Sequence, residues 1–174
     1  YLVNRALRTQ IGIVVESAEP REVHHFALLL GYGADCINPY LAFEAVKYVV
    51  RQEGLNFDCE EAIGRYIKAV DKGILKILSK MGISTLQSYR GAQIYEALGL
   101  GQDVVDRFFP GTASRIGGLS IDNIAQEVLE RHRNSFEDSG SPLLGTEGVY
   151  QWSKFGEFHL WNPESISYLQ DAVR

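Results

Sequence analysis

Residues 11–52 decide the fold class and read IGIVVESAEPREVHHFALLLGYGADCINPYLAFEAVKYVVRQ. The β-branched run Ile11–Glu16 predicts a strand of the near-continuous apolar kind that parallel sheets bury on both faces. Pro20 then stands where a first helical turn begins, and apolar residues follow at helical spacing. A short strand over Ala34–Asn38 and a helix over Leu41–Gln52 complete a β-α-β-α order, which predicts a parallel sheet with crossover helices.

The clearest helical pattern follows, with an apolar stripe that runs from Ile63 to Met81 and a glycine, Gly82, that predicts its end. Gly73 interrupts the stripe and predicts a bend. We then expect a third strand over Ile83–Tyr89 and a third return helix over Ala92–Leu98. Three βα units in a row predict an α/β fold, as part of a barrel or as a doubly wound sheet, and periodicity does not choose between them.

Beyond Gly99 the pattern changes to a mostly helical and loop extension. Residues 101–118 have little periodicity, whereas Ser120 is a predicted N-cap for the helix that follows it. A Ser-, Gly- and Pro-containing linker is predicted over Asn134–Gly148, and Asn162 precedes a last predicted helix. The aromatic residues of this tail are expected to pack on another part of a larger protein: Trp152, Phe155, Phe158 and Trp161.

Composition excludes several classes of function. The formal net charge is −5 and no Lys/Arg cluster exceeds a few residues, so we expect no nucleic-acid partner. No apolar stretch is long enough to span a membrane, so we expect no membrane partner. Cys36 and Cys59 are too few and too far apart for a zinc or iron–sulfur motif. Because the chain opens on Tyr1 and closes within a helical pattern, we expect a piece of a longer protein.

Polar residues at the end of the third predicted strand are the first candidates for contact with a ligand or a neighbouring domain. Ligands meet the carboxyl ends of strands in α/β folds, although capping of a barrel rim explains the same residues equally well. The candidates are Ser84, Gln87, Tyr89, Arg90 and Gln93. By the same argument Glu16, Asn38 and Tyr40 follow the first two strands.

A second candidate group consists of Arg115, Gly117 and Gly118, just before a predicted helix N-terminus. Exposed N–H groups there could hold a phosphate or carboxylate, and an ordinary structural turn is the alternative. His24 and His25 are adjacent, point about 100° apart on a helix, and are expected to be one packed or hydrogen-bonded histidine and one surface histidine. No catalytic residue and no metal site is predicted.

Several motifs resemble the large subunit of glutamate synthase, in order along nearly the whole chain. The most specific is Ser79–Ile94, SKMGISTLQSYRGAQI. Matches also occur at Asn38–Ala42 (NPYLA), Gly111–Ile116 (GTASRI) and Phe158–Glu164 (FHLWNPE). The resemblance implies that residues 1–100 are the end of a central α/β domain like a reduced TIM barrel. Residues 101–174 then form the linker and lead-in to an FMN-binding (β/α)8 barrel.

The family reaction makes two glutamates from glutamine and 2-oxoglutarate. The resemblance therefore implies an oxidoreductase when the subunit is complete, with this segment inactive alone and connecting the glutaminase and FMN sites. It implies FMN and an iron–sulfur cluster in the full subunit, neither bound by this segment. The implied partners are the glutaminase, FMN-barrel and β-helix domains of the same subunit, and an NAD(P)H-oxidising small subunit or ferredoxin. The implied location is the cytoplasm or a plastid stroma.

Two other classes of function stay open at this point. One is a stand-alone scaffold or binding module derived from the family. The other is a small barrel-type enzyme that binds an anionic ligand through Arg90 or the turn over 115–118.

Overall fold

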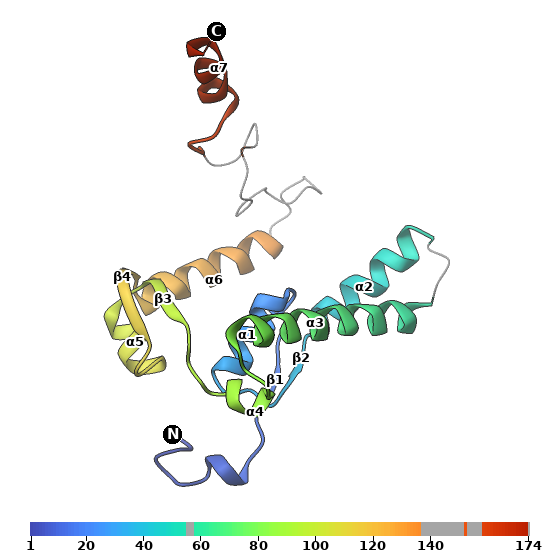
Figure 1. Ribbon diagram of the computed structural model, residues 1–174, viewed down its shortest axis with the longest axis vertical. Helices are drawn as coiled ribbons and strands as arrows, with labels where there is room; N and C mark the ends of the chain where they lie inside the picture. The colour runs from blue at the N-terminus through green and yellow to red at the C-terminus, as the bar shows by residue number, and fades with distance from the viewer. Residues whose placement is uncertain (55–57, 137–151, 153–157, 174) are drawn as a thin grey trace. The chain divides into compact units, whose positions relative to one another are not determined.

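The computed structural model describes residues 1–54, 58–136, 152 and 158–173 (Figure 1). The chain divides into two compact units, Tyr1–Ile121 and Asp122–Arg174. The predicted linker over 134–148 lies outside the described residues except for its first three, which belong to a helix. Among the described residues, no helix is both long and apolar enough to span a membrane.

The first unit opens with a 3-10 turn, Arg8–Gln10, and a two-stranded parallel sheet. Strand β1 (Val14–Glu16) pairs with β2 (Cys36–Asn38), and helix α1 (Val23–Gly31) connects them. This confirms the predicted β-α-β order. The prediction of a strand from Ile11 was wrong in length, and Val14 is 68% exposed, so β1 is not covered on both faces by described residues.

Helices α2 (Tyr40–Gln52) and α3 (Cys59–Met81) confirm the next two predicted helices. Helix α3 begins where the Asp58 carboxylate accepts a hydrogen bond from the Glu60 N–H, and it ends at Gly82 in the left-handed conformation. Its apolar stripe packs on α1. The buried cluster so formed consists of Phe26, Ala27, Leu30, Ile74, Leu78 and Tyr89.

Helix α3 is continuous through Gly73, from Cys59 to Met81. Gly73 permits a close approach of α1. A Cβ at Gly73 would lie 2.4 Å from Cγ2 and 2.7 Å from Cγ1 of Val23. This glycine therefore serves packing between α1 and α3, and the bend stays a prediction.

Gly73→Ala is expected to lower the free energy of unfolding. Overpacking against the stiff, β-branched Val23 costs ~1–3 kcal/mol, offset in part by the better helix propensity of alanine, worth ~1 kcal/mol. Gly64→Ala is the matched control on the same helix, since no described atom lies within 4 Å of its added Cβ. Urea denaturation followed by circular dichroism should show Gly64→Ala neutral or stabilised. Equal effects of the two substitutions would contradict the packing role.

The segment after α3 differs from its prediction. Residues predicted as a third strand contain a short helix, α4 (Leu86–Tyr89), because the Thr85 hydroxyl accepts a hydrogen bond from the Ser88 N–H and starts a helical turn. The predicted helix over 92–98 was also wrong. Gly91 and Gln93 have positive φ angles of 74° and 50°, which helices do not contain, and strand β3 (Glu96–Leu100) follows.

Strand β3 pairs in parallel with β4 (Ala113–Leu119) across helix α5 (Gln102–Phe108), whose Val104 and Val105 are buried. The described residues after residue 100 are mostly helical, as predicted, and the one departure is strand β4, which forms where loop was expected. The described residues form two separate two-stranded sheets and no closed barrel. The α/β class is confirmed at this level.

Two helices were predicted correctly near the end of the chain: α6 (Ile121–Phe136) and α7 (Pro163–Ala172). Helix α7 begins with a capping box, in which the Asn162 side chain accepts from the Ser165 N–H at 2.9 Å and the Ser165 hydroxyl accepts from the Asn162 N–H. Neither helix has a buried residue among those described. Of the predicted aromatic tail, Phe158 is 86% and Trp161 64% exposed, and Phe155 lies outside the described residues.

Candidate functional site

Three of the predicted contact residues, Gln87, Arg90 and Gln93, line one cleft of about 730 Å³ in the first unit. We call it the arginine cleft. Its walls come from the N-terminal segment, the end of α1 and the segment around α4. The lining residues are Val3, Arg8, Thr9, Gln10, Ile11, Gly12, Tyr32, Gly33, Asp35, Gln87, Arg90, Gly91 and Gln93.

Asp35 is the centre of the cleft's polar network. Its carboxylate accepts a hydrogen bond from the Ile13 N–H at 2.7 Å and pairs with Arg8 Nη2 at 3.3 Å. Arg90 Nη1 donates to the other carboxylate oxygen. Arg8 also donates to the Gly33 carbonyl at 2.7 Å, so it ties the N-terminal segment to the end of α1.

This network holds both guanidinium groups of the cleft in place, although one positive charge remains uncompensated among the lining residues. Two guanidinium groups share one carboxylate whose side chain is only 19% exposed. The cleft also lies at the amino ends of the strands, since Gly12 precedes β1 and Asp35 precedes β2. Ligands in α/β folds bind at the carboxyl ends, whereas polar networks at the amino ends serve stability. The geometry therefore favours a clamp that holds the N-terminal segment.

The clamp is expected to show in the pH dependence of stability. The Ile13 N–H first, and then the charges of Arg90 and Arg8, hold the pKa of Asp35 below its usual value of 3.8. A lowered folded-state pKa stabilises the fold above the unfolded pKa, and this contribution is lost as pH falls through the folded pKa. Asp35→Asn should therefore be less stable than the parent at neutral pH, with the deficit closing below pH 3.8.

Urea denaturation of both proteins across that pH range measures the deficit. Glu44→Gln is the control: the pKa of Glu44 is also lowered, chiefly by the hydrogen bond from Lys47, but this i,i+3 pair lies on the surface of α2. Its effect should be smaller, as for other surface pairs. A pH-independent deficit in Asp35→Asn would contradict the electrostatic clamp.

The other two residues of the first candidate group lie elsewhere. Tyr89 is 1% exposed and belongs to the buried cluster, and its hydroxyl hydrogen-bonds to that of Tyr95. Burial, followed by this hydrogen bond, raises the pKa of Tyr95. Ser84 is exposed and does not line the arginine cleft. At the carboxyl end of the sheet, Asn38 Nδ2 donates to Glu16 Oε2 at 2.9 Å, so those two predicted residues do meet.

The second candidate group lies on a strand. Arg115, Gly117 and Gly118 belong to β4, so the expected glycine turn before a helix is not there. Arg115 is 83% exposed, and its Nε lies 3.6 Å from a carboxylate oxygen of Glu96 on β3. None of the three lines the arginine cleft.

His25 has a structural role, in agreement with the sequence-based expectation. Its Nδ1 accepts hydrogen bonds from the Arg21 and Glu22 N–H groups at 3.1 and 3.2 Å, which closes the capping box of α1. His24 lies edge-on to the ring of Tyr95. In the described part of the chain, no three His, Cys, Asp or Glu side chains are grouped so that they could hold a metal ion.

Sequence reasoning missed Arg8 and Asp35. They lie 27 residues apart, and Asp35 and Arg90 lie 55 apart. Neither residue stands in a recognisable motif or at the carboxyl end of a strand. The sequence offered no signal for Asp35, which falls inside the predicted strand over Ala34–Asn38, whereas the observed strand β2 begins one residue after it.

Comparison with known proteins gives one family throughout. Residues 1–101 match the family model of the glutamate synthase central domain. The chain is 50% identical over 174 residues to the large chain of an NADPH glutamate synthase from Bacillus subtilis. It is 45% identical to an NADH glutamate synthase from Schizosaccharomyces pombe and 45% identical to a ferredoxin-dependent glutamate synthase from Pyropia yezoensis. These alignments cover all of this chain but 11%, 8% and 12% of the three relatives, so it spans about a tenth of their length.

Proposed function

The chain belongs to the glutamate synthase family, and from this premise we propose that it is a non-catalytic structural segment of a glutamate synthase large chain. In this proposal the complete subunit makes two glutamates from glutamine and 2-oxoglutarate. The segment holds the glutaminase and FMN domains in position and walls the space between their sites. Its contribution to the reaction is orientation and exclusion of water.

The observation that carries this proposal is the apolar surface of the first unit. The buried cluster is small, while large apolar side chains remain in water on several elements. Leu75 of α3 is 63%, Leu98 of β3 65% and Ile116 of β4 61% exposed. Leu98 and Ile116 are partners in the register of β3 and β4, so they lie together, and contiguous exposed apolar surface marks places that other protein parts cover. A segment that packs between domains of a larger subunit is expected to have such apolar surface, because the neighbouring domains cover it.

The described residues do not fit either cofactor of the proposed subunit. An iron–sulfur cluster requires several cysteine thiolates, and the chain's two cysteines lie on different elements, β2 and α3. The phosphate of FMN requires cationic groups that are directed at it, whereas the guanidinium groups of Arg8 and Arg90 are both bound to Asp35. We therefore place both cofactors in other parts of the proposed subunit.

The finer organisation is also a proposal. We assign residues 1–100 to the end of the central domain, as βα units of a reduced barrel, and 101–174 to the linker and lead-in to the FMN barrel. The proposed partners are the other domains of the same subunit. An electron donor is not assigned, because the names of the similar proteins specify NADPH, NADH and ferredoxin.

A domain exchange tests the proposal. The corresponding 174 residues of the Bacillus subtilis large chain are replaced by this chain, and glutamine-dependent glutamate formation is measured. We expect activity within a few-fold of the parent enzyme. The isolated chain should show neither glutaminase activity nor quenching of FMN fluorescence. Micromolar FMN binding with thermal stabilisation of the isolated chain would overturn the proposal, because it would show a self-sufficient cofactor site.

The same thermal-shift assay tests the alternative of an anion-binding enzyme. If the alternative held, 2-oxoglutarate or phosphate would stabilise the isolated chain, and Arg90→Ala or Arg115→Ala would abolish the shift. We expect no shift, since Arg90 is already paired with Asp35 and Arg115 lies 3.6 Å from Glu96.

A further inference from the structure

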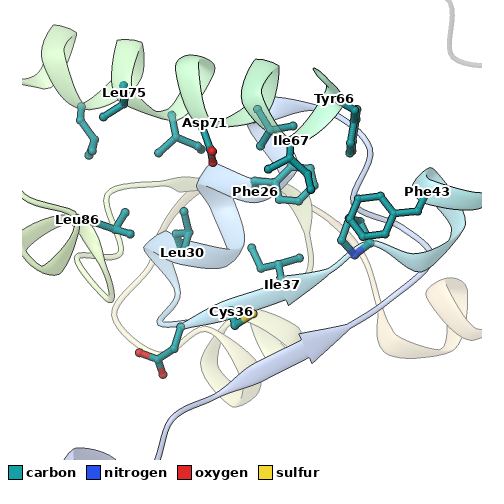
Figure 2. A pocket seen from close by; sticks show the side chains of 15 residues that line it. Phe26, Leu30, Cys36, Ile37, Phe43, Tyr66, Ile67, Asp71, Leu75 and Leu86 are labelled. Carbon is teal, nitrogen blue, oxygen red and sulfur yellow. The ribbon is translucent and has the colours of Figure 1, made fainter. Parts of the chain in front are cut away.

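An apolar groove of about 520 Å³ lies beneath α3. We call it the α3 groove. Figure 2 shows Ile67 and Leu75 of α3 above it and Cys36 and Ile37 of β2 below it, with Phe26 and Leu30 of α1 between. Phe43 of α2 and Leu86 of α4 stand toward its two ends.

The groove runs along the free edge of β2. Cys36 and Ile37 are consecutive residues of a strand, so their side chains point to opposite faces of the sheet. Both line the groove, which places it beside the strand and not over one face. In the described part of the chain, β2 pairs with β1 alone and its other edge has no strand.

The edge of β2 is open because the segment after α3 does not form a third strand. A helix that follows a strand of a parallel sheet packs over that strand and over the next strand along the chain. The segment after α3 forms α4 and not a third strand, so the place beside β2 is unfilled by described residues. Apolar side chains there stay in water, with Ile67 43%, Leu75 63% and Leu86 44% exposed.

The charge of the groove limits what can fill it. No Lys or Arg is among its lining residues, and Asp35 already binds two arginines. Asp71 of α3 points into the groove (Figure 2), and its carboxylate has no ion-pair or hydrogen-bond partner among the described residues. An occupant that carries one Lys or Arg beside apolar side chains would complement this surface.

We infer that the α3 groove is the docking site for an extended apolar segment of the same polypeptide from outside residues 1–174, which pairs along the free edge of β2. The inference rests on the proposed function, because the glutamate synthases that this chain matches are about ten times longer and hold the additional chain. Strand addition of this kind satisfies the backbone groups of an open edge, while side chains fill the adjacent pocket.

Cys36 provides the test, since its thiol is exposed and lines the groove. Maleimide labelling of Cys36 is followed by mass spectrometry in the isolated chain and in the full-length domain-exchanged subunit. We expect labelling at least about tenfold slower in the full-length subunit, which corresponds to ~1.4 kcal/mol. Equal labelling rates in a subunit that makes glutamate would overturn this inference and leave the proposed function intact.

Two substitutions on α3 test whether the segment that protects Cys36 from maleimide lies in the α3 groove. Leu75→Glu introduces a charge at the groove and should restore fast labelling in the full-length subunit. The control is Lys76→Glu, an adjacent exposed position that does not line the groove, and it should leave Cys36 protected. Circular dichroism of the isolated variants checks that both fold. If Leu75→Glu leaves Cys36 protected, the cover does not lie in the groove and the inference is wrong.

Labelling of the isolated chain at rising protein concentration tests whether a second copy of the chain occupies the groove instead. Protection that increases with concentration would show a second copy of the chain in the groove, and it would overturn the assignment to the same polypeptide. A rate independent of concentration agrees with the inference. Micromolar FMN binding by the isolated chain would instead contradict the proposed function itself.

Discussion

Tyr89→Ala is expected to lower the free energy of unfolding of the first unit by about 3–5 kcal/mol, the range for truncation of a buried aromatic side chain. Tyr89 is 1% exposed and is one of the two largest fully buried side chains among the described residues. Its ring packs in the cluster that joins α1 to α3. Urea denaturation followed by circular dichroism measures the loss, and the variant should unfold at a much lower urea concentration than the parent.

Tyr89→Phe is the matched control because it keeps the ring and removes only the hydroxyl. The Tyr95 hydroxyl then loses its partner, which should lower the free energy of unfolding by about 1 kcal/mol. If both substitutions had the same effect, the packing of the ring would not be the dominant contribution. If neither substitution changed the free energy of unfolding, Tyr89 would not stabilise the buried cluster. The predicted role of Tyr89 in contact with a ligand or a neighbouring domain would then be favoured.

Local signals predicted the first half of the unit well. Helix α3 could be predicted because its apolar stripe is long and its ends carry local caps, Asp58 and Gly82. The β1-α1-β2 order could be predicted because the first strand is rich in β-branched residues and because apolar residues recur at helical spacing in the segment that follows it. In each case the information lies within a few residues of the element that it specifies.

The second half could not be predicted in this way. In Ile83–Tyr89 the β-branched residues favour a strand, but the Thr85 cap starts α4. The sequence pattern predicts a helix over 92–98, whereas β3 begins at Glu96, because the pairing partner of β3, strand β4, lies across α5 in the sequence. The pairing depends on long-range contacts that a local pattern does not contain. The register is also irregular at Leu98 and Leu100.

Three of the predicted contact residues line the arginine cleft, but the strand on which their prediction was based is absent from the described residues. The prediction for Gln87, Arg90 and Gln93 depends on a third strand over Ile83–Tyr89, and helix α4 forms there instead. They do line one cleft, but it lies at the amino ends of β1 and β2. A contact of these residues with a ligand or another domain remains a prediction. The partner of Arg90 could not be found from sequence, since Asp35 is 55 residues away.

Gly118→Ala is expected to have an effect of similar size to Tyr89→Ala. A Cβ at Gly118 would lie 2.4 Å from the carbonyl oxygen and 2.8 Å from the carbonyl carbon of Gly99, both backbone atoms of β3. A backbone cannot move aside as a flexible side chain can, so β3 and β4 must separate at their irregular register. We expect a loss of ~3 kcal/mol in the free energy of unfolding, at the upper end for overpacking.

Gly117→Ala is the neighbouring control, since no described atom lies within 4 Å of its added Cβ. Its effect should stay within about 0.5 kcal/mol of zero. The pair of substitutions therefore separates two roles for this segment. An anion site built from exposed N–H groups tolerates alanine or fails alike at both positions, whereas close strand packing is sensitive at Gly118 alone. Urea denaturation with hydrogen exchange of the β3 amides measures the difference, and a tolerated Gly118→Ala would contradict the close approach of β4 to β3.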